Sequence, residues 1–226
     1  AIVRLVLFSF FYFLILLINF DFKFFFLLLI LTLIFLKFSI FTNFNDGGDF
    51  YIPLNYIFLI IGIFLYNFIY TNNFIINYLC IVYLSFLLSF YFFNFPPAKV
   101  FLGDSGSYLL SLFSMMIFMI NKNFDIIFIT IHFLSPILID SSFTLINRAL
   151  LKKNIFKSHN EHFFQRVIIK KNHLYLIKYT FFLQILNFFA YGMFLFYEFE
   201  LLTLLIFSVI NYYLYKLIIN KNVLRI

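Results

Sequence analysis

Long apolar runs, each close to the length of a membrane-spanning helix, follow one another through almost the whole sequence. A helix needs about 20 mostly apolar residues to cross the hydrocarbon core of a bilayer. Of the 226 residues, 65% are hydrophobic and only 11% are charged, which is too few charges for the water-facing surface of a soluble domain. We therefore predict an all-α, polytopic membrane bundle formed by a single domain over residues 1–226. Its eight spans are expected near residues 2–20, 24–42, 54–70, 74–93, 107–120, 125–146, 175–196 and 201–219.

The connections between these runs alternate between very short ones and long, polar ones. The three long connections cover residues 43–53, 94–106 and 147–174, and with eight spans they lie on the same side of the membrane. Most lysines and arginines belong to that side, against Lys23 and Lys122 on the other. Because basic loops remain in the cytoplasm, we predict that both termini and the three polar loops are cytoplasmic. The net charge of +7 would then lie beside anionic membrane lipids, and nothing in it indicates nucleic-acid binding.

The cysteine and the start of the chain narrow the choices further. Cys80 is the only cysteine, so an internal disulfide and a cysteine cluster for a metal are both excluded. The first apolar run, which follows Ala1, is long and lacks a small-residue cleavage site. We therefore do not expect a removable signal peptide.

The first long connection contains two carboxylates around a pair of glycines. Asp46 and Asp49 stand three residues apart in the segment NFNDGGD, which begins at Asn43. Glycines permit a tight turn, so both acids could point into one pocket and hold Mg2+, bind a sugar or nucleoside, or act as a base. The same sequence would also form an ordinary turn without any such role.

The second long connection is more specific. Pro96 and Pro97 are expected to end one helix, and Asp104 comes just before the next, flanked by Gly103 and Gly106. Free amides and the helix dipole favour anions at such a position, so a carboxylate there could share Mg2+ with a diphosphate. Alternatively, Asp104 or a neighbouring serine would simply cap the helix.

The sixth run and the last long connection supply further polar groups. Asp140 lies within an apolar helix about two turns before Arg148, where an acid is either functional or paired structurally. His159 and His162 would share one face if the segment were helical, and could present hydrogen-bonding groups to phosphates. No zinc-protease pattern accompanies them. We expect His132 to be structural and assign no role to His173.

Taken in order, these motifs resemble those of the bacterial polyprenyl-phosphate N-acetylhexosamine-1-phosphate transferases, a membrane family. NFNDGGD resembles its Asn-rich D-G-x-D-G loop, and PPAKVFLGDSGSYLL resembles its P-A-x-x-F-x-G-D-x-G-S segment. PILIDSSFTLINRALLKKNIFKSHNEHFFQR resembles its P-x-x-D, Arg and H-x-x-H-x-x-Q-R stretch, so the likeness extends to about residue 175.

The resemblance implies a reaction and a set of roles. Polyprenyl phosphate, such as undecaprenyl phosphate, would attack the sugar-linked phosphate of a UDP-N-acetylhexosamine and release UMP at the cytoplasmic face of a bacterial inner membrane. We also consider a homodimer, with a second copy of the chain as partner. Asp104 would be catalytic and hold Mg2+, or Mn2+ in its place, and Asp46 and Asp49 would be catalytic acids lining the nucleotide-sugar pocket. The residues expected to bind substrate are Asn43, Asn45, Gly103, Ser105, Asp140, Arg148, His159 and His162.

Two departures from the family pattern affect this interpretation. A triple-histidine cluster is represented by His159 and His162 alone, which resembles the O-antigen-initiating branch more than the peptidoglycan branch. An adjacent pair of aspartates, found upstream in the family, does not occur in this sequence. We therefore expect the chain to lack the first helices of the family. A membrane transporter or channel, and an inactive remnant of the transferase, remain the alternatives.

Overall fold

The described part of the computed structural model is helical throughout. It comprises residues 40–154 and 159–197, with isolated residues 10, 14, 33, 38, 206, 209, 210, 213 and 217. The predicted first and last spans, and all but the end of the second, fall outside the continuous stretches. The elements are α3 (Tyr51–Tyr66), its π-helical extension η2 (Asn67–Thr71), α4 (Phe74–Asn94), α5 (Gly103–Asn121), α6 (Asp125–Phe133), α7 (Ser135–Leu150), α8 (Phe163–Lys170) and α9 (His173–Tyr197).

Four of these helices are long and apolar enough to cross a membrane. They run over Tyr51–Thr71, Phe74–Asn94, Gly103–Asn121 and His173–Leu195, and a bent pair, α6 with α7, would make a fifth span. These segments match the predicted third, fourth, fifth and seventh spans to within a few residues. The fold class, a helical membrane protein, is therefore confirmed, although the described residues contain four or five spans rather than the eight predicted.

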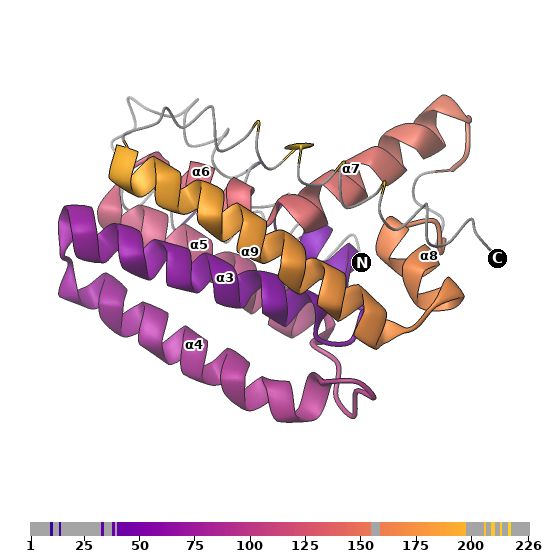
Figure 1. Ribbon diagram of the computed structural model, residues 1–226, viewed down its shortest axis with the longest axis horizontal. Coiled ribbons are helices and arrows are strands. Elements are labelled where there is room, and N and C mark those ends of the chain that lie inside the picture. The colour runs from indigo at the N-terminus through magenta and orange to yellow at the C-terminus, as the bar shows by residue number, and fades with distance from the viewer. Residues whose placement is uncertain are drawn as a thin grey trace.

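The predicted sixth span is not one straight helix. It is divided at Leu134 into α6 and α7, whose axes differ by 73°. Pro136 lies in the first turn of α7 and has no amide hydrogen to continue the ladder of α6. The prediction of a continuous helix over 125–146 was therefore wrong, and α7 leans away from the other long helices toward α8 (Figure 1).

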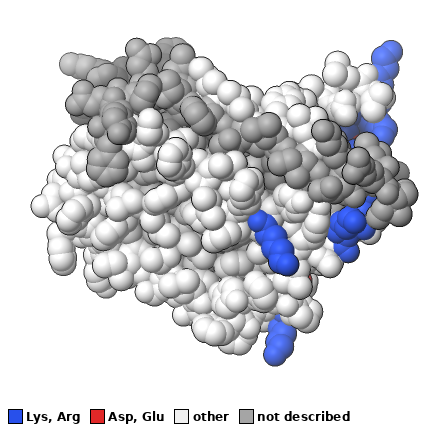
Figure 2. Space-filling model, in the orientation of Figure 1, with Lys and Arg blue, Asp and Glu red and all other residues white. Residues whose placement is uncertain are grey.

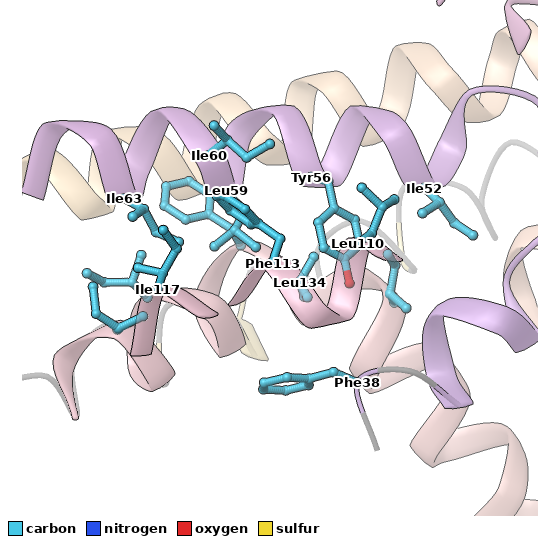
Figure 3. Close-up of a cluster of buried hydrophobic side chains, with 14 of the residues drawn as sticks. Phe38, Ile52, Tyr56, Leu59, Ile60, Ile63, Leu110, Phe113, Ile117 and Leu134 are labelled. Carbon is cyan, nitrogen blue, oxygen red and sulfur yellow. The ribbon is translucent and has the colours of Figure 1, made fainter. Parts of the chain in front are cut away.

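The centre of the bundle is α3, which packs against α4, α6 and α9. In Figure 1, α3 and α9 lie side by side along the bundle and α4 lies at its edge. Side chains of α3 point toward α5 and Leu134 in the apolar core, where Leu59, Ile63 and Phe113 are fully buried (Figure 3). α3 therefore fixes the positions of the other helices around it.

The ends of the helices bring the long polar loops together. Helix α4 begins where Oδ1 of Asn73 accepts the amide of Ile75 at 2.9 Å, and it ends at Asn94, just before Pro96 and Pro97. The loops at residues 45–50 and 95–102 then meet at one end of the bundle, where the amide of Ala98 donates to Asp49, and Phe164 of α8 stacks on Tyr51 at the same end. On the face shown in Figure 2, the visible lysines and arginines gather toward that end, where α7 and α8 lie.

Gly62 provides a test of the α3 packing. A methyl group added at Gly62 would stand 2.3 Å from Cε2 of Phe133, whose ring is fully buried. We therefore expect Gly62→Ala to destabilise the protein by about 1–3 kcal/mol, measured as a lower midpoint of thermal unfolding in detergent. Gly192→Ala is the matched control, because no atom lies within 4 Å of a methyl group added there. Equal stability of the two variants would contradict this packing.

Candidate functional site

The first polar loop reaches α5 through two of its side chains. Nδ2 of Asn43 donates to Oδ1 of Asp104 at 2.7 Å. Oδ2 of Asp46 accepts the amide of Gly103 at 2.6 Å. Gly103 begins α5 with a φ of +64°, a conformation that glycine adopts without strain. The NFNDGGD and GDSG segments, 61 residues apart at Asn43 and Asp104, therefore form one structural unit.

Two carboxylates lie close together in this unit. Burial raises the pKa of the Asp46 carboxyl above its ordinary value, and the nearby charge of Asp104 raises it further. The amides of Gly103 and Leu102 act in the opposite direction by donating hydrogen bonds to Asp46. A divalent cation near both acids would relieve their mutual repulsion.

The acid pair satisfies the requirements of Mg2+ only in part. No group of three or more His, Cys, Asp or Glu side chains that could hold a metal ion is found among the described residues. Mg2+ in enzymes, however, is commonly held by one or two carboxylates, several waters and the phosphates of a substrate. Asp46 and Asp104 therefore fit a cation whose coordination a bound diphosphate completes.

Asp49, the second acid of the loop, is buried and is held by neighbouring segments. Its Oδ2 accepts the amide of Ala98 at 3.1 Å, and Nδ1 of His173 lies 3.1 Å from both its amide nitrogen and its Oδ1. Asn94 adds a further link, because its Oδ1 accepts the amide of Phe50 and its Nδ2 donates to the carbonyl of Val100. These contacts give Asp49 a structural role in joining the two loops to α9; its predicted catalytic role stays a prediction.

The same first loop also contacts α7 and the histidine segment. Nδ2 of Asn45 donates to Oγ of Ser141 on α7 at 2.6 Å. The ring centroid of Phe44 lies 6.3 Å from that of His162. Asn43 and Asp46 thus contact α5, while Phe44 and Asn45 between them contact the α7–α8 region, so this segment joins the start of α5 to the region that contains the basic segment.

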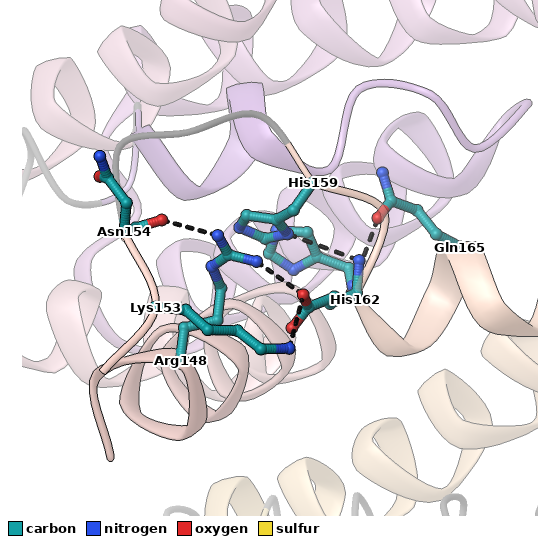
Figure 4. Close-up of polar contacts among 7 residues, drawn as sticks. Arg148, Lys153, Asn154, His159, His162 and Gln165 are labelled. Atoms are coloured by element: carbon teal, nitrogen blue, oxygen red, sulfur yellow. Dashed lines mark hydrogen bonds and ion pairs between the residues drawn. The ribbon is translucent and has the colours of Figure 1, made fainter. Parts of the chain in front are cut away.

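Arg148 lies at the centre of the basic segment, almost fully buried (Figure 4). Its Nη1 donates to Oε1 of Glu161 at 2.7 Å, and its Nη2 donates to the carbonyl of Asn154 at 2.6 Å. Lys153 donates to the same Glu161 oxygen at 3.1 Å, and this bond lowers the pKa of Glu161. Glu161 therefore balances only part of the positive charge, which includes Arg166 nearby.

The two histidines stack on one another beside this cluster. Their ring centroids are 5.0 Å apart, and His162 is buried (Figure 4). Burial lowers the pKa of His162 to about 4, and the charges of His159, Arg148 and Arg166 contribute. Burial and Arg148 also lower the pKa of His159. The helical spacing that motivated the pairing is wrong, since both histidines precede α8, but the rings still meet.

The carboxylate of Asp140 accepts hydrogen bonds from the first amides of α8. Its Oδ1 accepts the amide of Phe163 at 2.8 Å and its Oδ2 accepts the amide of Phe164 at 3.2 Å. A carboxylate at the N-terminus of a helix satisfies amides that have no partner within the helix and interacts favourably with its dipole. Asp140 also lines a small cavity with Asn147 and Arg166. The geometry favours the structural alternative for Asp140, and its predicted substrate contact stays a prediction.

The structure thus brings most of the predicted site residues to one end of the bundle. Ser105 lies at the same end, exposed in the first turn of α5. Sequence reasoning missed the parts played by Asn94, His173, Glu161 and Lys153. Glu161 and Lys153 had a signal, since both lie inside the third motif segment, and Asn94 begins the second long connection. The partners of His173 depend on tertiary contacts alone.

The fold and the site define a helical membrane protein whose acidic and basic groups lie at one end of its spans. Comparison with known proteins identifies its family. The sequence model of glycosyl transferase family 4 matches residues 1–122, which include both acidic loops. The chain therefore belongs to glycosyl transferase family 4. The match ends at Lys122, before α6–α9.

Curated relatives agree with this family. The chain is similar to phospho-N-acetylmuramoyl-pentapeptide-transferases of Staphylococcus aureus strains JH9, Newman and JH1, with 37% identity over 91 residues in each case. The alignment covers 38% of this chain and 28% of each relative. No solved structure matches significantly.

The contact between Asp140 and α8 generates one prediction. In Asp140→Asn, one oxygen is replaced by an NH2 group that cannot accept an amide, so one donor at the start of α8 loses its partner. We expect amide hydrogen exchange in Phe163–Lys170 to accelerate about tenfold, measured by mass spectrometry. Ser142→Ala, on another face of α7, is the control, and unchanged exchange in the Asp140 variant would rule out the capping role.

The low pKa of His162 generates a second prediction. Because the folded-state pKa of about 4 lies below the ordinary value of 6.5, neutral His162 stabilises the fold fully above pH 6.5, and this contribution is lost as the pH falls toward 4. The loss amounts to about 3 kcal/mol at most. NMR titration of the imidazole should give a midpoint near 4. A midpoint near 6.5, or the same acid sensitivity in His162→Asn, would contradict the burial of this ring.

Proposed function

We propose that the protein, as part of its full-length form, transfers a sugar phosphate from a nucleotide sugar to a polyprenyl phosphate. An oxygen of the lipid phosphate attacks the phosphorus of the sugar-linked phosphate. The bond from that phosphorus to the oxygen bridging the two phosphates breaks, and UMP leaves. The products are UMP and a lipid diphosphate sugar.

The observation that carries this proposal is the meeting of an acid pair and a basic cluster across the first loop. Asn43 and Asp46 contact the start of α5, while Phe44 and Asn45 contact the α7–α8 region. Transfer of a phosphoryl group requires mainly positioning and neutralisation of negative charge. A cation at the acids and a guanidinium opposite them would supply both.

Two buried polar atoms at this junction are left for a ligand to bind, because no group of the described residues forms a hydrogen bond with them. In the described part of the chain, Nε of Arg148 and Oδ1 of Asn45 have no hydrogen-bond partner. Leaving such groups unpaired costs about 1–3 kcal/mol each, so they are suited to a bound polar ligand. A phosphate oxygen fits Arg148, and a hydroxyl or amide N–H of a sugar fits Asn45.

The residues divide the work as follows. Asp46 and Asp104 would hold Mg2+, or Mn2+ in its place, which supplies charge neutralisation to the diphosphate when bound. Arg148, with His159 and His162, would bind the phosphate oxygens. Asp49 and Asp140 would hold the loops and α8 in place.

The finer assignments rest on the family and on the sequence. We propose a UDP-N-acetylhexosamine as donor and undecaprenyl phosphate as acceptor, because the similar relatives are named as phospho-N-acetylmuramoyl-pentapeptide-transferases. The pair His159 and His162 favours a simple N-acetylhexosamine and a role in starting O-antigen or another envelope polysaccharide. The basic loops favour the cytoplasmic face of a bacterial plasma membrane.

The role of Asp104 can be tested directly. We expect membranes containing the full-length protein to release UMP from UDP-GlcNAc when polyprenyl phosphate and Mg2+ are present. Asp104→Asn should reduce that rate by about 100-fold or more, because one of two cation-binding carboxylates is lost. Radiolabelled sugar recovered in lipid extracts gives the measurement.

The matched control is Asp125→Asn. Asp125 bonds to Tyr66 and Asn123 at the other end of the spans, so its replacement removes a carboxylate without touching the site. Activity should persist in this variant. Full turnover by Asp104→Asn would refute the metal assignment.

A further inference from the structure

The break between α6 and α7 leaves a backbone carbonyl in need of a donor. Ile137 and Leu138 both donate to the carbonyl of Leu134, at 3.0 and 2.9 Å. The carbonyl of Phe133 instead accepts Nε2 of Gln184 from α9, at 2.7 Å. Gln184 is fully buried. One side chain of α9 therefore replaces a helical hydrogen bond at the bend.

Helix α9 holds the residues on both sides of the break. The ring of His132 contacts the carbonyl of Asn187 through Nε2 at 2.9 Å, which explains its expected structural role. Nδ2 of Asn187 lies 3.4 Å from Oγ of Ser135, the first residue of α7. α9 thus contacts the last turn of α6 and the first of α7.

Gln184 also connects the break to the acidic loop. Its Nε2 donates to Oδ1 of Asn55 at 2.5 Å, and Nδ2 of Asn55 donates to the carbonyl of Tyr51 at 2.7 Å. Tyr51 begins α3 directly after the loop that contains Asp46. The side-chain amide of Gln184 therefore links α3 to the bend between α6 and α7.

We propose that Gln184 is a positioning residue, which fixes the angle between α6 and α7 and so places Arg148 and the α8 segment opposite Asp46 and Asp104. In apolar surroundings an unpaired carbonyl is costly, and no water competes for the amide. Without this bond, α7 would pivot at the proline break, and Arg148, about four turns along α7, would move most. The catalytic consequence rests on the proposed function, whereas the fixed angle does not.

The angle can be measured without any assay of activity. In the full-length protein with Cys80→Ser, spin labels at Phe124→Cys and Leu150→Cys report the distance across the bend, since both positions are exposed. We expect Gln184→Met, similar in size but without a donor, to broaden the distance distribution measured by pulsed electron resonance. Thr180→Val is the matched control, because it removes a buried bond within α9 only, to the carbonyl of Leu176.

Turnover supplies the second measurement. We expect Gln184→Met to lower kcat about tenfold and to raise KM for the nucleotide sugar, because Arg148, which would bind its phosphates, is displaced relative to the acid pair. Thr180→Val should change neither. If Gln184→Met does not fold, Gln184→Asn keeps the amide but withdraws it by one methylene from Phe133, and the same broadening is expected.

The outcomes separate this inference from the proposed function. If a folded Gln184 variant gives a distance distribution as narrow as that of the parent protein, Gln184 does not fix the angle between α6 and α7. Broadening without any loss of kcat in an active enzyme would overturn the positioning role. An inactive parent protein would count against the proposed function, and the distance measurement would still decide whether Gln184 fixes the bend.

Discussion

The contacts of one short segment, residues 43–46, where a helical stretch passes into a turn, are the constraint on which the rest of the site depends. Its first and last side chains bond to α5, at Asp104 and Gly103, and the two between them contact the α7–α8 region, at His162 and Ser141. Because the turn that follows this segment leads directly into α3, which contacts α4, α6 and α9, the segment is held by the most central helix of the bundle. Displacing it would separate the acid pair from Arg148.

The apolar surroundings of the bundle explain why so few polar residues hold it together. Lipid offers no hydrogen-bond partner to a polar group within the spans, so single side chains form contacts that water would weaken elsewhere. Gln184 donates to Phe133 and Asn55, while Tyr191 donates to the carbonyl of Gly62, where α3 lies against Phe133 of α6. A bent span is tolerated here because its free carbonyl lies against α9 and not against lipid.

Most of the described spans could be predicted from apolar runs, because the thickness of a bilayer sets a length that is visible in sequence. The alternation of loops likewise predicted that NFNDGGD and GDSG lie at the same side of the spans, and the structure joins them through Asn43 and Asp46. The break at Leu134 and the helix α8 were not, since Pro136 near the start of a run and an eight-residue amphipathic helix give weak signals. Asp49 and Asp140 were recognised as important acids, but their amide partners at Ala98, Phe163 and Phe164 lie far away in sequence.

The sequence by itself determined that this chain is a helical membrane protein, which loops carry its chemistry and which family those motifs indicate. Hydrophobic length and local motifs are properties of short segments, so they need no knowledge of the fold. Tertiary structure alone decided which acids face one another and which are bound to backbone amides, and it decided the angle at which α7 presents Arg148. Those outcomes depend on pairings between distant residues such as Gln184 and Phe133, and burial in an apolar bundle makes such pairings strong while leaving no local pattern to predict them.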